Sequence, residues 1–336
     1  MTGPLKSVRV VFGYVARRIS DLQLWRTLMN RLSLGIVVTA VVAAGMASAG
    51  GPVAAAAAGP CGTASGAAPA TWDHVVLLVF ENKSPNLVFK KGAAPYLTNL
   101  SQQCGSGTNM NTPDPLTSLG NYLALTSGYT GHPVHITANR GPKAWPQDSV
   151  SIFEQTQGSW KELSESAPTN CYTGSTAFNF TVNHTPAPYY TRLAAECATR
   201  DIPMPATPDL SAAFTLLSPN KSHIMHEDDT PGMTTQFQRV QAGDTWAAGY
   251  LPKVFASPEY QAGKTVVIVT FDEGTAKSTL VPFIVVSPYT PVGYTTNVRM
   301  DHYATLKGME QMLGLGLLGH AADAGTPSIR DYYGLG

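Results

Sequence analysis

Uninterrupted apolar segments constrain the fold of this chain more than any other feature of its sequence. They are rich in Val, Ile and Leu, and they stand at residues 74–80 (HVVLLVF), 213–219 (AFTLLSP), 265–271 (TVVIVTF) and 281–288 (VPFIVVSP). A strand of a parallel sheet reads as a continuous apolar run, because helices cover both of its faces. These segments therefore predict the strands of a buried, mostly parallel sheet.

Segments with helical character alternate with the predicted strands, at residues 95–104, 243–257 and 302–315. Strands that alternate with helices indicate one α/β domain. The stretch 129–200 is rich in Thr, Asn, Pro, Tyr and His and has weak periodicity. We predict loops and short helices there, over one end of the sheet.

The amino terminus has the order of a secretory signal peptide. An uncharged segment, residues 32–47, follows Arg31 and runs into small residues, and its apolar part is shorter than the roughly 20 residues of a membrane-spanning helix. A start at Met29 would give a signal of ordinary length. The alternatives are an uncleaved anchor and a twin-arginine signal at Arg17-Arg18. We expect a signal peptide at 1–48, an Ala/Gly-rich linker at 49–70 and the folded domain at 71–336. The protein would then be secreted or associated with the cell envelope.

The chain has four cysteines, Cys61, Cys104, Cys171 and Cys197. An even number in an oxidising compartment favours two disulfide bonds, although four cysteines allow three connectivities. Pairing between neighbours in the sequence would join Cys61 to Cys104 and Cys171 to Cys197. The separations do not match the short paired spacings of a structural zinc site.

The charge balance gives no reason to expect a nucleic-acid partner. The 336 residues include 22 basic and 22 acidic side chains, whereas proteins that bind nucleic acids usually carry a clustered basic excess. Any binding of phosphate must then depend on a local site.

Oxygen-bearing residues follow two of the predicted strands. Glu81-Asn82 come directly after 74–80, and Asp272-Glu273 come directly after 265–271. Ligands of open α/β sheets bind beyond the carboxyl ends of the strands, and such side chains suit a hard or borderline divalent cation. Acidic and Asn residues at strand ends also begin turns and cap helices, and for either pair alone that structural role is an equal alternative.

Thr117 and Ser118 precede a helix-like segment, LGNYLAL (119–125). A hydroxyl there can lie where helix amides point at an anion, which favours attack on phosphorus. The structural alternative is a Ser or Thr that only caps the helix.

Several short segments, in a fixed order along the chain, carry a resemblance to a known family. They are ENKS (81–84), SLGNYLALTSG (118–128), NHTP (183–186), SPNKSHIMHEDD (218–229), GDTW (243–246), VTFDEG (269–274) and HYATLKGMEQMLGL (302–315). Together they resemble the phosphoesterase family of bacterial acid phosphatases and phospholipases C, which belongs to the alkaline phosphatase superfamily. The resemblance spans about 75 to 335, and it implies a three-layer α/β/α fold with a mostly parallel central sheet.

The resemblance also implies roles for individual residues. One divalent metal ion, which could be Ca, Mg, Mn, Fe or Zn, would be bound by Glu81, Asn82, Asp272 and Glu273. Ser118 would be the nucleophile, with Thr117 as the alternative. The implied contacts with the phosphate ester are the catalytic His184 and His226 and the substrate-binding Asn121 and His302. A lone histidine otherwise has a hydrogen-bonded structural role. Asp244 is a weaker candidate, which would otherwise cap the helix that follows it.

The chain departs from the family's pattern at two places. His223-Ile224 stand where many members have Asn-Asp, and Gly120 stands where many have Pro. The loss of an acidic residue near His226 removes a partner that would orient this histidine. Asp228 or Asp229 would have to replace it.

These residues predict a secreted, metal-dependent phosphoesterase that acts on a small-molecule or lipid-headgroup phosphate ester, without a stable membrane span after signal cleavage. The short mature chain favours an acid phosphatase that hydrolyses monoesters through a phosphoserine intermediate. Phosphatidylinositol 3-phosphate is one such monoester. A phospholipase C-type phosphodiesterase and an inactive exported binding protein are the alternatives.

Overall fold

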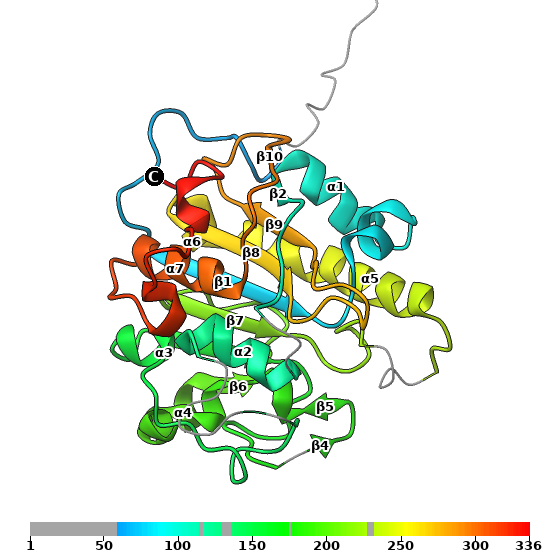
Figure 1. Ribbon diagram of the computed structural model, residues 1–336, viewed down its shortest axis with the longest axis vertical. Helices are drawn as coiled ribbons and strands as arrows, with labels where there is room; N and C mark the ends of the chain where they lie inside the picture. Colours follow the sequence, from blue (N-terminus) through cyan, green and yellow to red (C-terminus); the bar gives the residue numbers. More distant parts are fainter. Residues whose placement is uncertain (1–58, 114–116, 130–135, 137, 175, 227–231) are drawn as a thin grey trace, which may run out of the picture. The chain divides into compact units, whose positions relative to one another are not determined.

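The computed structural model describes residues 59–113, 117–129, 136, 138–174, 176–226 and 232–336. The expected signal peptide, its proposed start at Met29, Arg17-Arg18, Asp228 and Asp229 lie outside these residues. In the described part, a sheet of eight strands has the order β10-β2-β9-β8-β1-β7-β3-β6 (Figure 1). Neighbouring strands are parallel, except that β9 is antiparallel to both β8 and β2. This confirms the mostly parallel sheet predicted from the sequence.

The strands of this sheet are β1 (His74–Phe80), β2 (Gly105–Gly107), β3 (Trp160–Ser164), β6 (Asp201–Pro203), β7 (Phe214–Ser218), β8 (Thr265–Phe271), β9 (Phe283–Val286) and β10 (Thr295–Thr296). A separate hairpin consists of β4 (Thr176–Ala177) and β5 (Phe180–Thr181). The α-helices are α1 (Pro95–Gln103), α2 (Ser118–Ser127), α3 (Ile152–Gln155), α4 (Ala194–Arg200), α5 (Gln236–Phe255), α6 (Pro258–Gln261) and α7 (His302–Met312). Single turns of other helix types are η1 (Asn86–Lys90), η2 (Val182–His184), η3 (Ala187–Tyr189), η4 (Thr191–Leu193), η5 (Gly319–Ala322) and η6 (Ile329–Asp331).

Strands β1 and β8 lie side by side in the middle of the sheet. Their parallel register pairs Phe80 with Phe271, the last residue of each strand. Both strands are buried along almost their whole length, which explains why both segments are continuously apolar. The residues that follow the two strands consequently emerge at the same point of the carboxyl edge of the sheet.

Helices cover both faces of this sheet. α2 packs against α7 and α1 packs against α5, and Figure 1 shows the two pairs on opposite sides. A Cβ atom at Gly243 of α5 would lie 2.5 Å from the carbonyl oxygen of His223 and 2.5 Å from the side chain of Met225. Glycine there allows the segment 223–225 to lie directly against α5. The carbonyl of Ile224 then accepts from the amide of Glu81 at 2.9 Å, beside the end of β1.

The structure corrects two of the predicted elements. Residues 129–200 contain not only loops and short helices but also β3, which lies inside the sheet between β7 and β6. Its sequence WKELS lacks a continuous apolar run, because Lys161 and Glu162 interrupt it. Glu162 is nevertheless fully buried. α5 begins at Gln236, well before the predicted 243, because Thr235 and Gln238 form a capping box at its start.

Two disulfide bonds join Cys61 to Cys104 and Cys171 to Cys197. This is the pairing expected from their proximity in the sequence. The first bond attaches the start of the described chain to the domain, together with a 2.6 Å hydrogen bond from the Tyr260 hydroxyl to the carbonyl of Pro60. Within the described ranges, no helix combines the length and the apolar character that crossing a bilayer requires.

Candidate active site

The ends of β1 and β8 bring the two acidic segments together. The amide of Asp272 donates to the carbonyl of Phe80 at 2.9 Å, which extends the parallel ladder by one residue. Oδ1 of Asp272 accepts from the amide of Asn82 at 3.2 Å and from the amide of Glu273 at 2.6 Å. The structure therefore brings together the four residues that the resemblance implies as metal ligands. We call Glu81, Asn82, Asp272 and Glu273 the carboxylate cluster.

The carboxyl groups of the carboxylate cluster are buried close to one another. Glu81 and Asp272 have no exposed surface. Burial raises the pKa of Glu81 well above its usual value, and the charges of Asp272 and Glu273 raise it further. Burial also raises the pKa of Asp272 to about 6, and burial with the charge of Asp272 raises the pKa of Glu273 to about 8. A cation would displace protons from these groups and relieve their repulsion.

Several oxygens of the cluster have no hydrogen-bond partner among the described residues: Oε1 of Glu81, Oδ1 of Asn82 and Oδ2 of Asp272. Buried polar atoms are normally satisfied, so unsatisfied ones require an explanation such as an ion. Carboxylate and amide oxygens are ligands that divalent cations accept. The residues present therefore fit the metal that the resemblance implies.

Ser118 begins α2 and is buried beside Glu81. Its hydroxyl donates to Oε2 of Glu81 at 3.0 Å. The hydroxyl of Thr117 has a different role, because its oxygen accepts a hydrogen bond from the amide of Gly120 and caps the helix. Of the two candidate hydroxyls, Ser118 is thus the one that contacts the carboxylate cluster.

Asn121 lies one turn further along α2 and is fully buried. Its amide group donates to the carbonyl of Thr117 at 3.4 Å, and its Oδ1 has no hydrogen-bond partner within the described chain. Burial and Asp272 raise the pKa of Glu273, and a side-chain hydrogen bond from Asn121 opposes this rise. Asn121 therefore lies on the same helix as Ser118, close enough to Glu273 to influence its pKa.

Of the two predicted catalytic histidines, His184 lies beside Glu81, and His226 lies near His184. Nε2 of His184 is 3.1 Å from Oε1 of Glu81, although the pair lacks the alignment of a hydrogen bond. The ring of His184 stacks on that of Tyr122, with centroids 5.9 Å apart, and lies 6.3 Å from the ring of His226. Burial lowers the pKa of His184, and the charges of His226 and Lys221 lower it further. The neutral form of His184 is therefore favoured.

His302 and Asp244 contact backbone groups. Nε2 of the fully buried His302 lies 2.6 Å from the carbonyl oxygen of Asp272, and burial lowers the pKa of His302 to about 4. This nitrogen thus faces the backbone of an implied metal ligand. Asp244 accepts from the amides of Tyr96 and Leu97 and caps α1. It does not cap the helix that follows it, since it lies inside α5.

Two residues that the sequence did not single out also lie against the carboxylate cluster. Lys83 is fully buried, and its Nζ donates to the carbonyl of Asn82 at 3.0 Å. Tyr122 is fully buried, and burial and the charges of Glu81 and Asp272 raise its pKa. The segment ENKS places a Lys next to the implied ligands, but nothing in four polar residues distinguishes a buried Lys from an exposed one.

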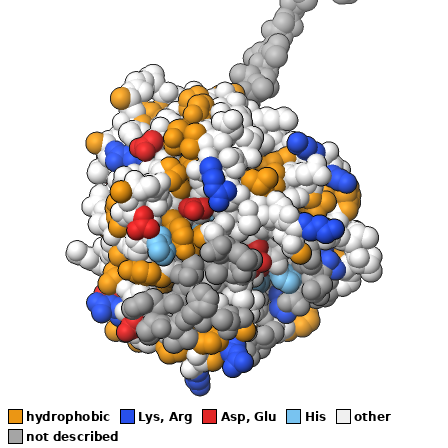
Figure 2. All heavy atoms as spheres, in the orientation of Figure 1, with side chains coloured by type: hydrophobic (Ala, Val, Ile, Leu, Met, Phe, Trp, Pro, Cys, Tyr) orange, Lys and Arg blue, Asp and Glu red, His pale blue; other side chains and the backbone are white. Residues whose placement is uncertain are grey.

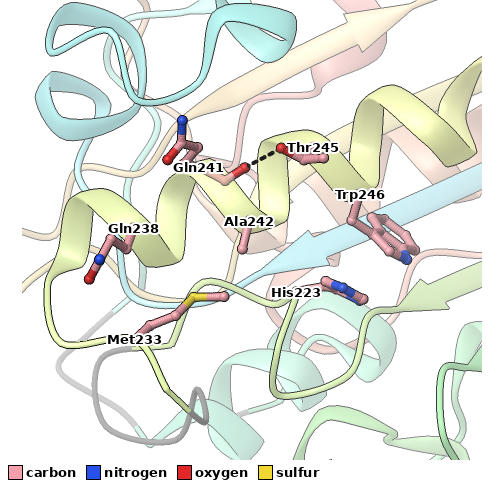
Figure 3. Close-up of a pocket in the computed structure, with 7 residues that line it drawn as sticks. All are labelled: His223, Met233, Gln238, Gln241, Ala242, Thr245 and Trp246. Carbon is pink, nitrogen blue, oxygen red and sulfur yellow. Dashed lines mark hydrogen bonds between the residues drawn. The ribbon is translucent and has the colours of Figure 1, made fainter. Parts of the chain in front are cut away.

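A cavity of about 510 Å³ lies between α5 and the segment that leads to His226. Figure 3 shows Trp246 of α5 and His223 next to each other at one end of this cavity. The two rings stack with centroids 6.3 Å apart, and Nδ1 of His223 lies 2.9 and 3.0 Å from the carboxylate oxygens of Glu165. His223, which departs from the family's Asn, therefore has a carboxylate partner of its own.

Another group of metal-ligand types lies elsewhere in the described chain. Ligand atoms of Cys171, Cys197 and Asp201 come within 4.8 Å of one another. The two sulfurs form a disulfide bond, and a metal is bound by thiolates rather than by a disulfide. We therefore exclude this group as a metal site.

Known proteins share the sequence and the fold. The sequence model of the phosphoesterase family matches residues 87–316, which include Ser118, His184 and Asp272, whereas Glu81 and Asn82 lie just before the match. The phosphatidylinositol-3-phosphatase of Mycobacterium tuberculosis (strain ATCC 25618 / H37Rv) is 26% identical over 279 residues, which cover 81% of this chain and 86% of that protein.

Two solved structures show the same fold at low sequence identity. A protein in the alkaline phosphatase superfamily from Vibrio parahaemolyticus has a TM-score of 0.52 at 12% identity and covers 78% of this chain and 72% of its own. The lipoteichoic acid synthase from Listeria monocytogenes has a TM-score of 0.53 at 11% identity, with coverages of 79% and 76%. The predicted alkaline-phosphatase-like α/β fold is thus confirmed. Since the family match covers more than half of the sequence, this chain belongs to the phosphoesterase family, whose members are hydrolases that act on phosphoric esters.

Proposed function

We propose that the chain is a metal-dependent phosphomonoesterase of the acid phosphatase type, with Ser118 as its nucleophile. One observation carries this proposal: the Ser118 hydroxyl lies 3.0 Å from Glu81, in a buried cluster of carboxylates. A hydroxyl beside cation ligands and a histidine provides the groups that phosphoryl transfer to a serine requires.

The carboxylate cluster would hold one divalent cation, and its oxygen donors are compatible with Ca, Mg, Mn, Fe or Zn. When bound, the cation would lower the pKa of the serine hydroxyl and neutralise charge on the phosphoryl oxygens. His302 would be a positioning residue, because its Nε2 contacts the backbone carbonyl of Asp272 and would hold the backbone of that ligand in place.

In the first step, Oγ of Ser118 would form a bond to phosphorus while the bond from phosphorus to the ester oxygen breaks. The Ser118 proton, which points at Oε2 of Glu81, would pass to that carboxylate. His226 would supply a proton to the departing alkoxide, and neutral His184 would donate a hydrogen bond to a phosphoryl oxygen. Water would then attack the phosphoserine from the opposite side and return a proton to His226, while the bond from phosphorus to Oγ breaks and Oγ takes back its proton from Glu81. One ester and one water thus give one alcohol and one phosphate.

The preference for monoesters and the physiological substrate are part of the proposal. The name of the Mycobacterium tuberculosis relative, a phosphatidylinositol-3-phosphatase, makes phosphatidylinositol 3-phosphate a substrate to test. This lipid carries its reactive phosphate as a monoester on the headgroup. A phospholipase C-type activity would instead act on a diester.

Two variants of neighbouring hydroxyls test the proposal. Ser118→Ala is expected to reduce the turnover of p-nitrophenyl phosphate by at least about 10³-fold, because it removes the nucleophile. Thr117→Ala is the matched control. It removes a helix cap, which costs about 1 kcal/mol of stability, and it should retain most of the activity.

The same assay separates the alternatives. Faster hydrolysis of p-nitrophenylphosphocholine than of p-nitrophenyl phosphate would indicate a phosphodiesterase. A purified protein with no bound metal and no turnover of either ester would indicate an inactive binding protein. Undiminished turnover by Ser118→Ala would exclude Ser118 as the nucleophile.

Export of the protein is a further part of the proposal. The two disulfide bonds support it, because such bonds persist mainly in oxidising compartments. Fractionation of cells that produce the full chain would test it, and protein found only in the cytosol would contradict it.

A further inference from the structure

A second cavity, of about 640 Å³, lies at the carboxyl edge of the sheet. Its walls come from η1, α1, the end of β2 and the segment 275–280. Ser84 lines it two residues after Asn82, and Thr275 lines it two residues after Glu273. Residues two apart in sequence lie within roughly 7 Å of each other. The chain segments that follow Asn82 and Glu273 therefore form part of the wall of this cavity.

One wall of this cavity has an unusual backbone. Residues Asn86–Lys90 form a single turn of π-helix, and Asn86, Phe89 and Lys90 line the cavity. Single π-helical turns are rare and occur frequently at functional sites. Here the turn starts four residues after the implied ligand Asn82. Its position places it between the carboxylate cluster and α1, in the wall of the cavity.

Hydroxyl groups form most of the polar part of the walls. Thr108 donates its hydroxyl proton to the carbonyl of Thr296, so that its oxygen can still accept. Thr275 and Ser278 accept from the amides of Lys277 and Leu280, so that their hydroxyl protons can still be donated. The cavity thus offers both donors and acceptors to a ligand that carries several hydroxyl groups.

The charge of the cavity is positive. Lys90 is the one charged side chain among the described residues that line it, and no carboxylate lines it. Lys90 and the next residue, Lys91, are both exposed. Figure 2 shows basic side chains gathered along the right-hand side of the viewed face. An ammonium group favours an anionic ligand and repels a cationic one such as choline.

We propose that this cavity binds the alcohol part of the phosphate ester, and that it selects a hydroxyl-rich alcohol which carries a second anionic group. A sugar or cyclitol phosphate has this chemistry, either free or as the headgroup of a lipid. The cavity has the volume of a typical site for a small organic ligand. This inference rests on the proposed phosphomonoesterase function, two of whose implied cation ligands, Asn82 and Glu273, lie two residues before the cavity-lining Ser84 and Thr275.

Two charge reversals one residue apart test the selection for an anion. Lys90→Glu is expected to reduce kcat/KM for myo-inositol 1,3-bisphosphate about tenfold, mainly through KM, as expected for one charge contact near a surface. Turnover of p-nitrophenyl phosphate should stay within about twofold, since this small ester has no second anion. Hydrolysis of phosphocholine should improve. Lys91→Glu makes the same charge change outside the cavity and should leave all three substrates unaffected.

Two substitutions on α1 test the cavity itself. Ser101 lines it, whereas Gln103 is exposed and does not. Ser101→Trp should fill the cavity and slow the bisphosphate at least about tenfold more than p-nitrophenyl phosphate, and Gln103→Trp should not. Equal effects of Lys90→Glu and Lys91→Glu, or no effect of Ser101→Trp on the bisphosphate, would overturn the inference.

The same design separates the two sources of the ligand and the two proposals. Dioctanoyl phosphatidylinositol 3-phosphate, tested beside the soluble bisphosphate, shows whether a lipid headgroup or a free polyol phosphate is preferred. If the parent protein hydrolyses no ester, the proposed function fails. Calorimetric binding of the bisphosphate to the parent and to Lys90→Glu then tests whether the cavity binds an anionic polyol. Equal binding to both overturns the inference, and weaker binding to Lys90→Glu supports it.

Discussion

The carboxylates and the histidines of the candidate site come from two differently built regions. Glu81 and Asp272 follow central strands that are paired in register up to their last residues. His184 and His226 come from the part of the chain between residues 176 and 226, where a two-stranded hairpin, three single helical turns and the short helix α4 precede β6 and β7. The sheet therefore fixes the carboxylates directly, whereas the histidines depend on side-chain contacts such as the stack of His184 on Tyr122.

This difference predicts how much each group would contribute to the proposed reaction. A cation site needs several ligands at fixed positions, and a buried, hydrogen-bonded sheet supplies them. A proton donor or a hydrogen-bond donor works in a less constrained place. We expect changes in the strand-end carboxylates to have larger effects than changes in the histidines.

The largest effect is expected for Asp272→Asn. It keeps the size of the side chain but removes a charge that the proposed cation would need. We predict a loss of kcat/KM of more than about 100-fold, beyond the usual effect of residues that only orient a ligand, together with weaker metal binding by calorimetry. Asp323→Asn, at an exposed position, is the control. Full activity of Asp272→Asn would show that the strand-end carboxylates are not essential.

The next largest effect is expected for His184→Gln. Removing a histidine that assists proton transfer or stabilises charge typically costs about 100-fold or more, and we expect the lower end because His226 stays in place. Metal affinity should change less than in Asp272→Asn. His320→Gln, which is exposed, controls for the loss of an imidazole. A larger loss for His184→Gln than for Asp272→Asn would reverse the assigned order.

A third prediction concerns the pH dependence of stability. In the metal-free protein the pKa values of Asp272 and Glu273 are raised to about 6 and about 8, and that of Glu81 is raised well above its usual value. The folded state thus binds protons more tightly than the unfolded state. The stability contributed by these groups is present below about pH 4 and is lost as the pH rises through the folded values. Metal should restore it.

The measurement is thermal unfolding with metal or with a chelator. We expect the increase in Tm caused by metal to be at least about 3 °C larger at pH 8 than at pH 5. Glu81→Gln should reduce this difference, because it removes one of the three titrating groups. An increase in Tm that is independent of pH would show that the cation does not compete with these protons.

The smallest effect is expected for His223→Asn, which restores the residue of many relatives. The side chains of His223 and Glu165 are 33% and 22% exposed, and partly exposed pairs contribute about 0.5 kcal/mol to stability. Activity should change by no more than about twofold. A much larger loss would show that the cavity in Figure 3 takes part in the reaction.

The accuracy of the sequence-based predictions follows the same division between the two regions. β1 and β8 were predicted with their observed ends, because burial on both faces requires a continuous apolar run. The close approach of Glu81 and Asp272 then follows from the parallel register. β3 could not be predicted in this way, since Glu162 interrupts its apolar pattern although it is fully buried.

Side-chain directions were the least predictable feature. Glu162 pairs in register with Asp201, and burial raises the pKa of Asp201 to about 7. No local pattern predicts that two acidic residues far apart in sequence are buried together. The contact of His302 with a backbone carbonyl is likewise a tertiary feature, and motif matching assigned this residue to the substrate.

The pairing of Phe80 with Phe271 limits how relatives of this protein can diverge. Successive side chains of a strand point to opposite faces, so the loss of one residue inside β1 or β8 would turn every later side chain around. Glu81 would then face away from Asp272. Insertions and deletions should therefore be absent from residues 74–82 and 265–273 of homologues, and they should accumulate in the connections between elements, where no register has to be kept.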